Sequence, residues 1–370
     1  MLVSRLFPRV LPKINGPVRT LASSARSPLA NIAELSKARL SSLVVLTTSC
    51  GFLSAGLPLY VSVPTLVGAS VGTALCASSA GTINQVLEVD RDKRMKRTRH
   101  RPLPSGDVSI SQASMLATAT GALGGTVLYL TTDPLTTLLG VGNIALYAPI
   151  YTLSKQSTEW NTWIGAVVGA IPPVMGWTAS GGSLMDPECL FLGSSLFLWQ
   201  FPHFFALSWM HRKDYAQGGF QMVPVNDPTG ERTASLIFRY SVYLSALPIA
   251  STIVGMTNPM FAVEGCLLNG YLLYKSRKFQ QDKSNQNARK IFLTSLWYLP
   301  CLLGLFILHN KNWDDEEREG VLTEKVKMMK EKGLEYCFHE KVDAKDLCPV
   351  PHSKDGGKEG EKEKEKKASK

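Results

Sequence analysis

The residues best suited to chemistry are one amide and two carboxylates that recur at intervals of four near the end of an apolar stretch. They are Asn84, Glu88 and Asp92. Because a helix turns by about 100° per residue, steps of four keep three side chains within roughly 80° of one face. Amide and carboxylate oxygens are hard ligands for Mg²⁺. Water and phosphate oxygens usually complete the octahedron around this ion. The spacing therefore predicts a Mg²⁺ site, although solvated charges at an ordinary helix end would give the same pattern.

A dense basic run follows these three side chains directly, and residues 97–103 read RTRHRPL. Carboxylates and guanidinium groups are thus gathered where the chain leaves an apolar stretch. The run has no interleaved aromatic residues and is tethered to a membrane span. These features do not indicate a nucleic-acid partner.

Tyr151 and Lys155 stand one helical turn apart near the end of another apolar stretch. They could add a phenol and an ammonium group to an anion site, although a lysine that reaches for the membrane surface would look the same. The glycines that follow, at 165, 169 and 176, permit close helix packing, and Pro172 and Pro173 interrupt the backbone pattern.

His203 lies beside a proline in an apolar aromatic run, where an imidazole must find a partner. It could bind a cofactor carboxylate, assist a proton transfer or touch an iron centre. A structural histidine bonded to a neighbouring helix is the alternative. Arg212 and Asp214 follow at the exit of the same stretch, where an ion pair and a catalytic role are both open.

The elements that carry these residues are apolar stretches of about 20 residues, long enough to cross a hydrocarbon core of about 30 Å as helices. The 370-residue chain is 45% hydrophobic and 19% charged, and its mean hydropathy of +0.01 averages apolar spans with very polar ends. The sequence predicts an all-α polytopic membrane protein of nine transmembrane helices. They are expected near residues 39–59, 63–86, 112–131, 134–154, 161–180, 188–210, 234–255, 258–274 and 291–309.

Lysine and arginine alternate sharply between the loops that connect these spans. The connections after the second, fourth, sixth and eighth spans are basic, and those near residues 60, 132, 181–187 and 256 contain no Lys or Arg. The positive-inside rule then places the basic loops, and with them the acidic helix end, on the matrix side of an inner membrane. Nine spans would leave the C-terminus in the intermembrane space.

The two ends of the chain differ from the rest. Residues 1–33 are basic, contain no acid and lack a compact apolar core, which is typical of a mitochondrial transit peptide; a merely basic, disordered N-terminus is the alternative. Residues 34–310 form the expected transmembrane domain. The charged tail, 311–370, is expected to be disordered or transiently helical. Four of its residues could bind zinc, namely Cys337, His339, Cys348 and His352, and a disulfide between Cys337 and Cys348 is the alternative.

Taken together, these motifs resemble the UbiA superfamily of intramembrane prenyltransferases over about residues 35–305. The resemblance rests on their order and spacing, and the segments that carry it are Asn84-Gln85, Glu88, Asp92, Met95, Arg97-Thr98, Arg101-Pro102-Leu103, Tyr151-Thr152, Lys155, Gly169-Ala170, Pro172-Pro173, Gly176-Trp177, residues 200–204 and Asp214-Tyr215. His203 and Asp214 stand where quinone-type members look rich in aspartate. That departure favours the haem-modifying branch and leaves open how a second Mg²⁺ would be held.

The resemblance implies transfer of a farnesyl group from farnesyl diphosphate to a vinyl group of haem b, with water adding to give haem o. This is an early step of haem a synthesis for cytochrome c oxidase assembly. Mg²⁺ would be held by Asn84, Glu88 and Asp92 as Lewis acid and template. The expected diphosphate ligands are Arg97, Arg101, Tyr151 and Lys155, and the expected haem-side residues are His203, Arg212 and Asp214.

The expected partners are farnesyl diphosphate, haem b, the lipid bilayer and the next haem-modifying enzyme. Three other functions stay open on sequence alone. A UbiA-type enzyme could act on an aromatic quinone precursor, a scaffold for oxidase assembly could bind haem without catalysis, and a carrier could bind an anionic metabolite. A carrier would not explain the four-residue spacing of the carboxylates.

Overall fold

The computed structural model describes residues 26–57 and 59–313, and these residues are predominantly helical. The one β-type contact among them is an isolated bridge between Thr257 and Asn310. The all-α class predicted from the sequence is therefore confirmed.

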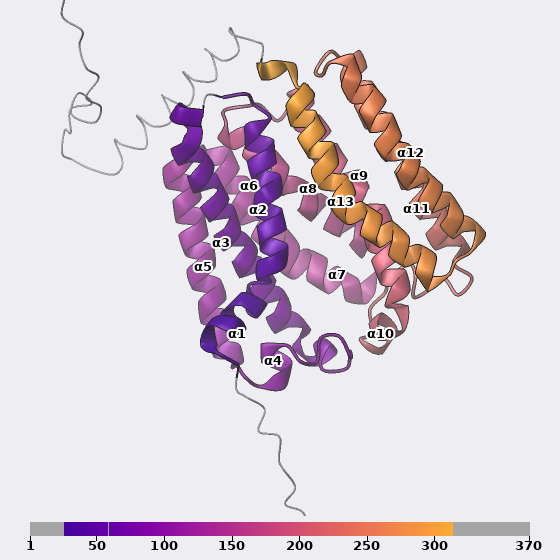
Figure 1. The fold of residues 1–370 in the computed structure, drawn as a ribbon. Helices are drawn as coiled ribbons and strands as arrows, with labels where there is room; N and C mark the ends of the chain where they lie inside the picture. The colour runs from indigo at the N-terminus through magenta and orange to yellow at the C-terminus, as the bar shows by residue number, and fades with distance from the viewer. Residues whose placement is uncertain (1–25, 58, 314–370) are drawn as a thin grey trace, which may run out of the picture.

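The helices follow one another with short connections, and Figure 1 shows their arrangement. In chain order they are α1 (Pro28–Leu35), α2 (Ala38–Leu53), α3 (Leu59–Asp92), α4 (Pro102–Ser105), α5 (Ile110–Thr131), α6 (Pro134–Ala145), a π-helical segment (Leu146–Tyr151), α7 (Thr152–Ser157), α8 (Asn161–Ala179), α9 (Pro187–Met210), α10 (Arg212–Gln217), α11 (Glu231–Ile253), α12 (Pro259–Gln281) and α13 (Asn285–His309).

Five of these helices are long and apolar enough to cross a membrane, namely α3, α5, α9, α11 and α13. The other four spans expected from the sequence fall on α2, on α6 with the π-helical segment and α7, on α8 and on α12. Length and hydropathy do not select these four. The 16 residues of α2 are too few, and polar side chains such as Asn269 and Lys275 interrupt the apolar pattern of α12.

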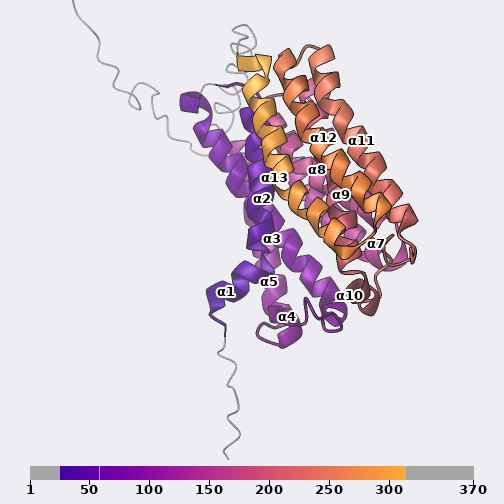
Figure 2. The same cartoon turned by 45° about the vertical axis from the view of Figure 1, so that its right-hand side comes forward.

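The short helices α1, α4 and α10 lie together at one end of the long-helix bundle in both views (Figures 1 and 2). The long helices pack in neighbouring pairs, among them α3 with α5, α2 with α8, α8 with α9, and α9 with α11 and α13. The end marked by the short helices is also the end at which the polar residues of α3 emerge. The fold therefore gathers the polar connections over one mouth of the bundle.

Two glycines allow α2 and α8 to approach almost backbone to backbone. A Cβ atom added at Gly51 would lie 2.0 Å from the carbonyl oxygen of Pro173, and one added at Gly176 would lie 1.9 Å from that of Thr48. Any side chain at either position would force the helices apart. Close packing of small residues is a common way for membrane helices to associate, because the bilayer supplies no hydrophobic drive between them.

Most of the predicted transit peptide, 1–33, and of the predicted tail, 311–370, lies outside the described residues. The tail residues Cys337, His339, Cys348 and His352 are among those outside. Residues 28–33 belong to α1, whose C-terminal end packs on α3 through Gln85. The side-chain amide of Gln85 donates to the carbonyl oxygens of Glu34 at 2.8 Å and Leu35 at 3.0 Å.

Candidate active site

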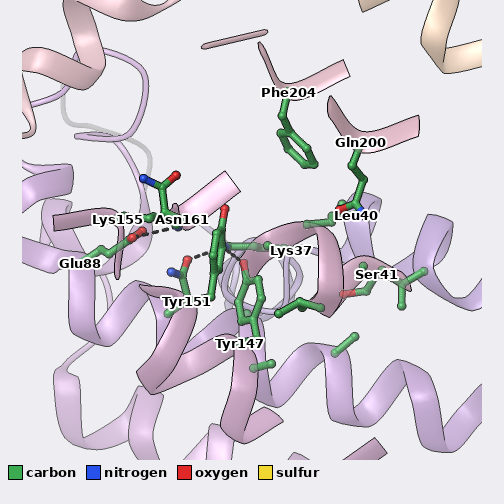
Figure 3. A pocket seen from close by; sticks show the side chains of 18 of the residues that line it. Lys37, Leu40, Ser41, Glu88, Tyr147, Tyr151, Lys155, Asn161, Gln200 and Phe204 are labelled. Carbon is green, nitrogen blue, oxygen red and sulfur yellow. Dashed lines mark hydrogen bonds and ion pairs between the residues drawn. The ribbon is translucent and has the colours of Figure 1, made fainter. Parts of the chain in front are cut away.

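A cavity of about 350 Å³ lies inside the bundle, with walls from α2, α3, α6, α8 and α9 and with the polar connections at one end (Figure 3). This volume is within the range of small-molecule sites. Small side chains on α3, among them Ala77, Ala80 and Gly81, leave room for the apolar part of the cavity. The polar part lies further along the same helix.

Asn84, Glu88 and Asp92 all line the cavity from one face of α3, with exposed fractions of 0%, 4% and 2%. Each has a cationic partner. Glu88 accepts a hydrogen bond from the Lys155 ammonium at 3.0 Å, Asp92 accepts one from the Arg101 guanidinium at 2.7 Å, and Asn84 accepts one from Lys37. Buried charge is tolerated here because it is paired.

The basic loop after α3 reaches the same cavity through Arg97 and Arg101. The carboxylate of Asp214 holds this loop, because it accepts hydrogen bonds from the backbone N–H of Lys96 at 2.8 Å and of Arg97 at 3.4 Å. The guanidinium of Arg97 lies over the ring of Tyr215, 5.5 Å from its centroid. The segment that contains α10 therefore holds Arg97 at the cavity.

His211 follows the last residue of α9 and lies outside the apolar span. Burial and the positive charge of Arg97 hold the pKa of His211 below its usual range, against the opposing effect of Asp214. Both effects favour the neutral imidazole.

The π-helical segment brings two tyrosines to the cavity beside Lys155. The rings of Tyr147 and Tyr151 are 5.4 Å apart, and the Lys155 ammonium lies 4.4 Å from the centre of the Tyr151 ring. Pro149 stands inside this segment, and π-helical turns occur frequently at functional sites. Tyr151 and Lys155 were expected from the sequence, whereas Tyr147 was not.

Lys37 is a cavity residue that the sequence does not single out. Its ammonium group donates to Asn84 and, at 3.0 Å, to the hydroxyl of Tyr147 (Figure 3). Among the described residues it is the one non-glycine with positive φ, at 49°, because the chain bends sharply there between α1 and α2. In the sequence it looks like an ordinary flanking charge before an apolar span, and no local signal distinguishes it.

His203 and Arg212 do not line the cavity. The His203 ring stacks on Trp199 and its Nδ1 lies 2.8 Å from the hydroxyl of Ser295 on α13. Arg212 donates to the side chain of Asn285 at 3.0 Å, also on α13. The contact of His203 matches the alternative of a structural histidine bonded to a neighbouring helix, whereas Arg212 contacts an amide rather than Asp214. A haem-side role for these residues stays a prediction.

The polar end of the cavity can take a metal ion only together with other ligands. The described residues contain no group of three or more His, Cys, Asp or Glu side chains that could hold a metal ion. The set formed by Asn84, Glu88 and Asp92 offers hard oxygen atoms on one face, and phosphate oxygens and water would complete an octahedron around Mg²⁺. The donor set fits a metal that arrives with a phosphorylated substrate.

Comparison with known proteins places these features in a family. Residues 44–299 match the UbiA prenyltransferase family. The mitochondrial protoheme IX farnesyltransferase of Arabidopsis thaliana is 39% identical over 79% of this chain and 68% of its own length. The human protein of that name is 43% identical over 75% of this chain and 61% of its own length, so the chain spans less than two thirds of it.

A bacterial relative, the protoheme IX farnesyltransferase of Solibacter usitatus, is 35% identical over 74% of this chain and 97% of its own length. Among solved structures, a digeranylgeranylglyceryl phosphate synthase aligns with a TM-score of 0.63 and 14% identity, covering 76% of this chain and 98% of its own. A UbiA homolog from Archaeoglobus fulgidus bound to GPP and Mg²⁺ aligns with a TM-score of 0.56 and 15% identity, covering 75% of this chain and 99% of its own. These structures show a shared fold.

Proposed function

The chain belongs to the UbiA prenyltransferase family, and from that premise we propose that it transfers the farnesyl group of farnesyl diphosphate to a vinyl group of haem b. Relatives named protoheme IX farnesyltransferase support the choice of substrates. The observation that carries the proposal is the lining of the cavity, in which apolar and small side chains adjoin paired carboxylates and cations. A prenyl diphosphate has the same division between an apolar chain and a charged head.

The residues at the polar end meet the demands of diphosphate departure. Arg97, Arg101, Lys155 and Lys37 converge there, and charge-assisted hydrogen bonds from such groups stabilise a leaving phosphate. As the C–O bond breaks, both electrons go to the diphosphate oxygen and positive charge develops on the allylic carbons. The rings of Tyr147 and Tyr151 can face that charge.

The apolar part of the cavity keeps water from the allylic cation until the vinyl carbon attacks it. Positive charge then lies on the carbon next to the porphyrin ring, where water adds and loses a proton to give the hydroxyethylfarnesyl group of haem o. Mg²⁺ held by Asn84, Glu88 and Asp92 would neutralise diphosphate charge as a Lewis acid.

Incubation of the purified protein with haem b, farnesyl diphosphate and Mg²⁺, followed by mass analysis of the haem, tests the proposal. Unmodified haem, with 4-hydroxybenzoate prenylated instead, would refute it.

Replacement of Lys37 should identify it as a diphosphate ligand. In Lys37→Gln we expect the KM for farnesyl diphosphate to rise about tenfold, because one charge-assisted hydrogen bond is worth about 1.5–3 kcal/mol. The KM for haem b should change little. Arg39→Gln is the matched control, since Arg39 is exposed two residues further along the chain. An unchanged KM for farnesyl diphosphate in Lys37→Gln would show that Lys37 does not bind the diphosphate.

We further propose that the protein has nine membrane spans in the mitochondrial inner membrane, with the cavity mouth facing the matrix. The relatives named as mitochondrial and the basic loops at the mouth of the cavity support this topology. Protease added to mitoplasts should then remove the tail after residue 312 and spare the loop at 93–101. Cleavage of that loop in mitoplasts whose inner membrane is intact would reverse the topology.

The product carries a 15-carbon chain and would stay in the same membrane. The partner of this enzyme would then be the next haem-modifying enzyme, which receives haem o without its passage through water. Co-purification of the two from mild detergent tests this pairing, and exclusive recovery of each alone would count against it.

A further inference from the structure

A second hollow, of about 620 Å³, lies on the flank of the bundle, where the beginning of α8 meets α11. We call it the flank groove, and its lining includes Trp160, Trp163, Gln221, Arg232, Ser235 and Arg239. None of its lining residues lines the catalytic cavity. The two share a wall, because the N–H of Gln221 donates to the Lys155 carbonyl at 2.8 Å.

Two arginines on α11 dominate the charge of the flank groove. Arg232 and Arg239 are seven residues apart, which places them on one face about 10.5 Å apart along the axis, with Ser235 between them. Arg232 is paired with Glu159 at 2.6 Å. Arg239 is exposed and forms no hydrogen bond or ion pair within residues 26–57 and 59–313. The groove therefore offers one unpaired guanidinium and one that is already neutralised.

Arg239 lies within a helix that is long and apolar enough to cross a membrane. Ionisable side chains in such helices are rare and usually have a partner or a function. Nearby apolar residues of α11 are exposed, with Val242 at 42% and Tyr243 at 50%, as expected for a surface that faces lipid. The partner of Arg239 should therefore come from the bilayer side.

Aromatic residues place the flank groove at the boundary between membrane and water. Trp160 is 65% exposed, and the indole N–H of Trp163 donates to the hydroxyl of Tyr240 at 2.6 Å. Tryptophan and tyrosine are enriched at the level of lipid headgroups. The groove thus opens at the depth at which lipid phosphates lie.

We propose that the flank groove binds the phosphate headgroup of an anionic phospholipid, whose acyl chains run along α11. A guanidinium can donate two parallel hydrogen bonds to phosphate oxygens, and basic pockets between membrane helices recognise anionic headgroups in this way. A zwitterionic headgroup brings its own positive charge close to Arg239 and binds less well. Because Phe220 and Met222 on either side of Gln221 line the catalytic cavity, a bound lipid also restrains one wall of that cavity.

Native mass spectrometry of the full chain in detergent tests this proposal by titration with dioleoylphosphatidylglycerol or dioleoylphosphatidylcholine. The anionic lipid should be retained preferentially. Arg239→Gln should weaken its binding about tenfold, as expected for loss of a charge-assisted contact. Glu159→Gln should strengthen it, because Arg232 is then released to the phosphate. Arg289→Gln, an exposed arginine on α13 outside the groove, should bind as the unaltered chain does.

Several results would overturn the proposal. Equal binding of the two lipids, or unchanged binding in Arg239→Gln, would exclude a headgroup site in the groove. Displacement of the lipid by inorganic phosphate at equal concentration would indicate a site for soluble anions. Loss of haem b binding in Arg239→Gln, with the lipid retained, would assign the groove to the substrate. Each readout is a bound mass, so the result is independent of whether the chain makes haem o.

Discussion

Glu88→Gln is expected to lower the rate of haem o formation at least about a hundredfold. The substitution removes one of the two carboxylates on the cavity face of α3 and so weakens both metal binding and the neutralisation of the leaving diphosphate. It also leaves the Lys155 ammonium, whose side chain is 11% exposed, without its partner. The rate is measured by mass analysis of haem at saturating farnesyl diphosphate, and the Mg²⁺ concentration for half-maximal rate should rise.

Two further variants separate chemistry from folding. Asp90→Asn is the matched control, because Asp90 lies on the same helix with its side chain 79% exposed and pairs with Lys93. It should retain full activity. The double variant Glu88→Gln/Lys155→Met removes both buried charges, so it should unfold at the temperature of the unaltered chain and still be inactive. Near-normal turnover in Glu88→Gln would exclude this carboxylate from the active site.

Gly176→Ala should lower the melting temperature of the purified protein by about 5 °C or more. The added methyl group would lie 1.9 Å from the Thr48 carbonyl oxygen and would also meet the backbone nitrogen of Phe52 at 2.7 Å. Backbone atoms cannot turn aside as a flexible side chain can, so α2 and α8 must separate. Overpacking of this kind costs about 1–3 kcal/mol.

The control for this substitution is Gly142→Ala. Gly142 also lies in a helix, but an added Cβ there has no neighbour within 4 Å, and alanine has the higher helix propensity. Its melting temperature should stay the same or rise slightly. Fluorescence-detected size exclusion after heating measures both melting temperatures. A similar fall in melting temperature for both variants would show that the contact between α2 and α8 is not the cause.

The sequence predicted the site best where its residues lie on one face of a single helix. The spacing of Asn84, Glu88 and Asp92 placed them together because helical periodicity is local. The apolar stretches of the sequence likewise fall on the long helices of the structure. The number of helices that cross a membrane was harder to predict. The helix α2 is short and α12 is partly polar, so a hydropathy criterion does not select either of them.

The rest of the site depends on contacts between distant segments, which local patterns do not encode. Lys37 reaches Tyr147 from 110 residues away, and its left-handed backbone conformation has no signature in the residues around it. His203 illustrates the opposite problem. Apolar and aromatic residues occur all around α9, so periodicity could not show that its imidazole points towards α13 rather than into the cavity.

The excess of cations at the polar end also bears on the order in which the proposed metal and diphosphate would bind. Four cations and two carboxylates line the cavity, which leaves a net charge of plus two. A divalent ion alone would raise this excess, whereas farnesyl diphosphate, with a charge of about minus three, would offset it. Electroneutrality thus favours entry of the metal with the diphosphate or after it. Calorimetry should detect Mg²⁺ binding only when a non-reactive diphosphate analogue is present, and tight binding without the analogue would contradict this order.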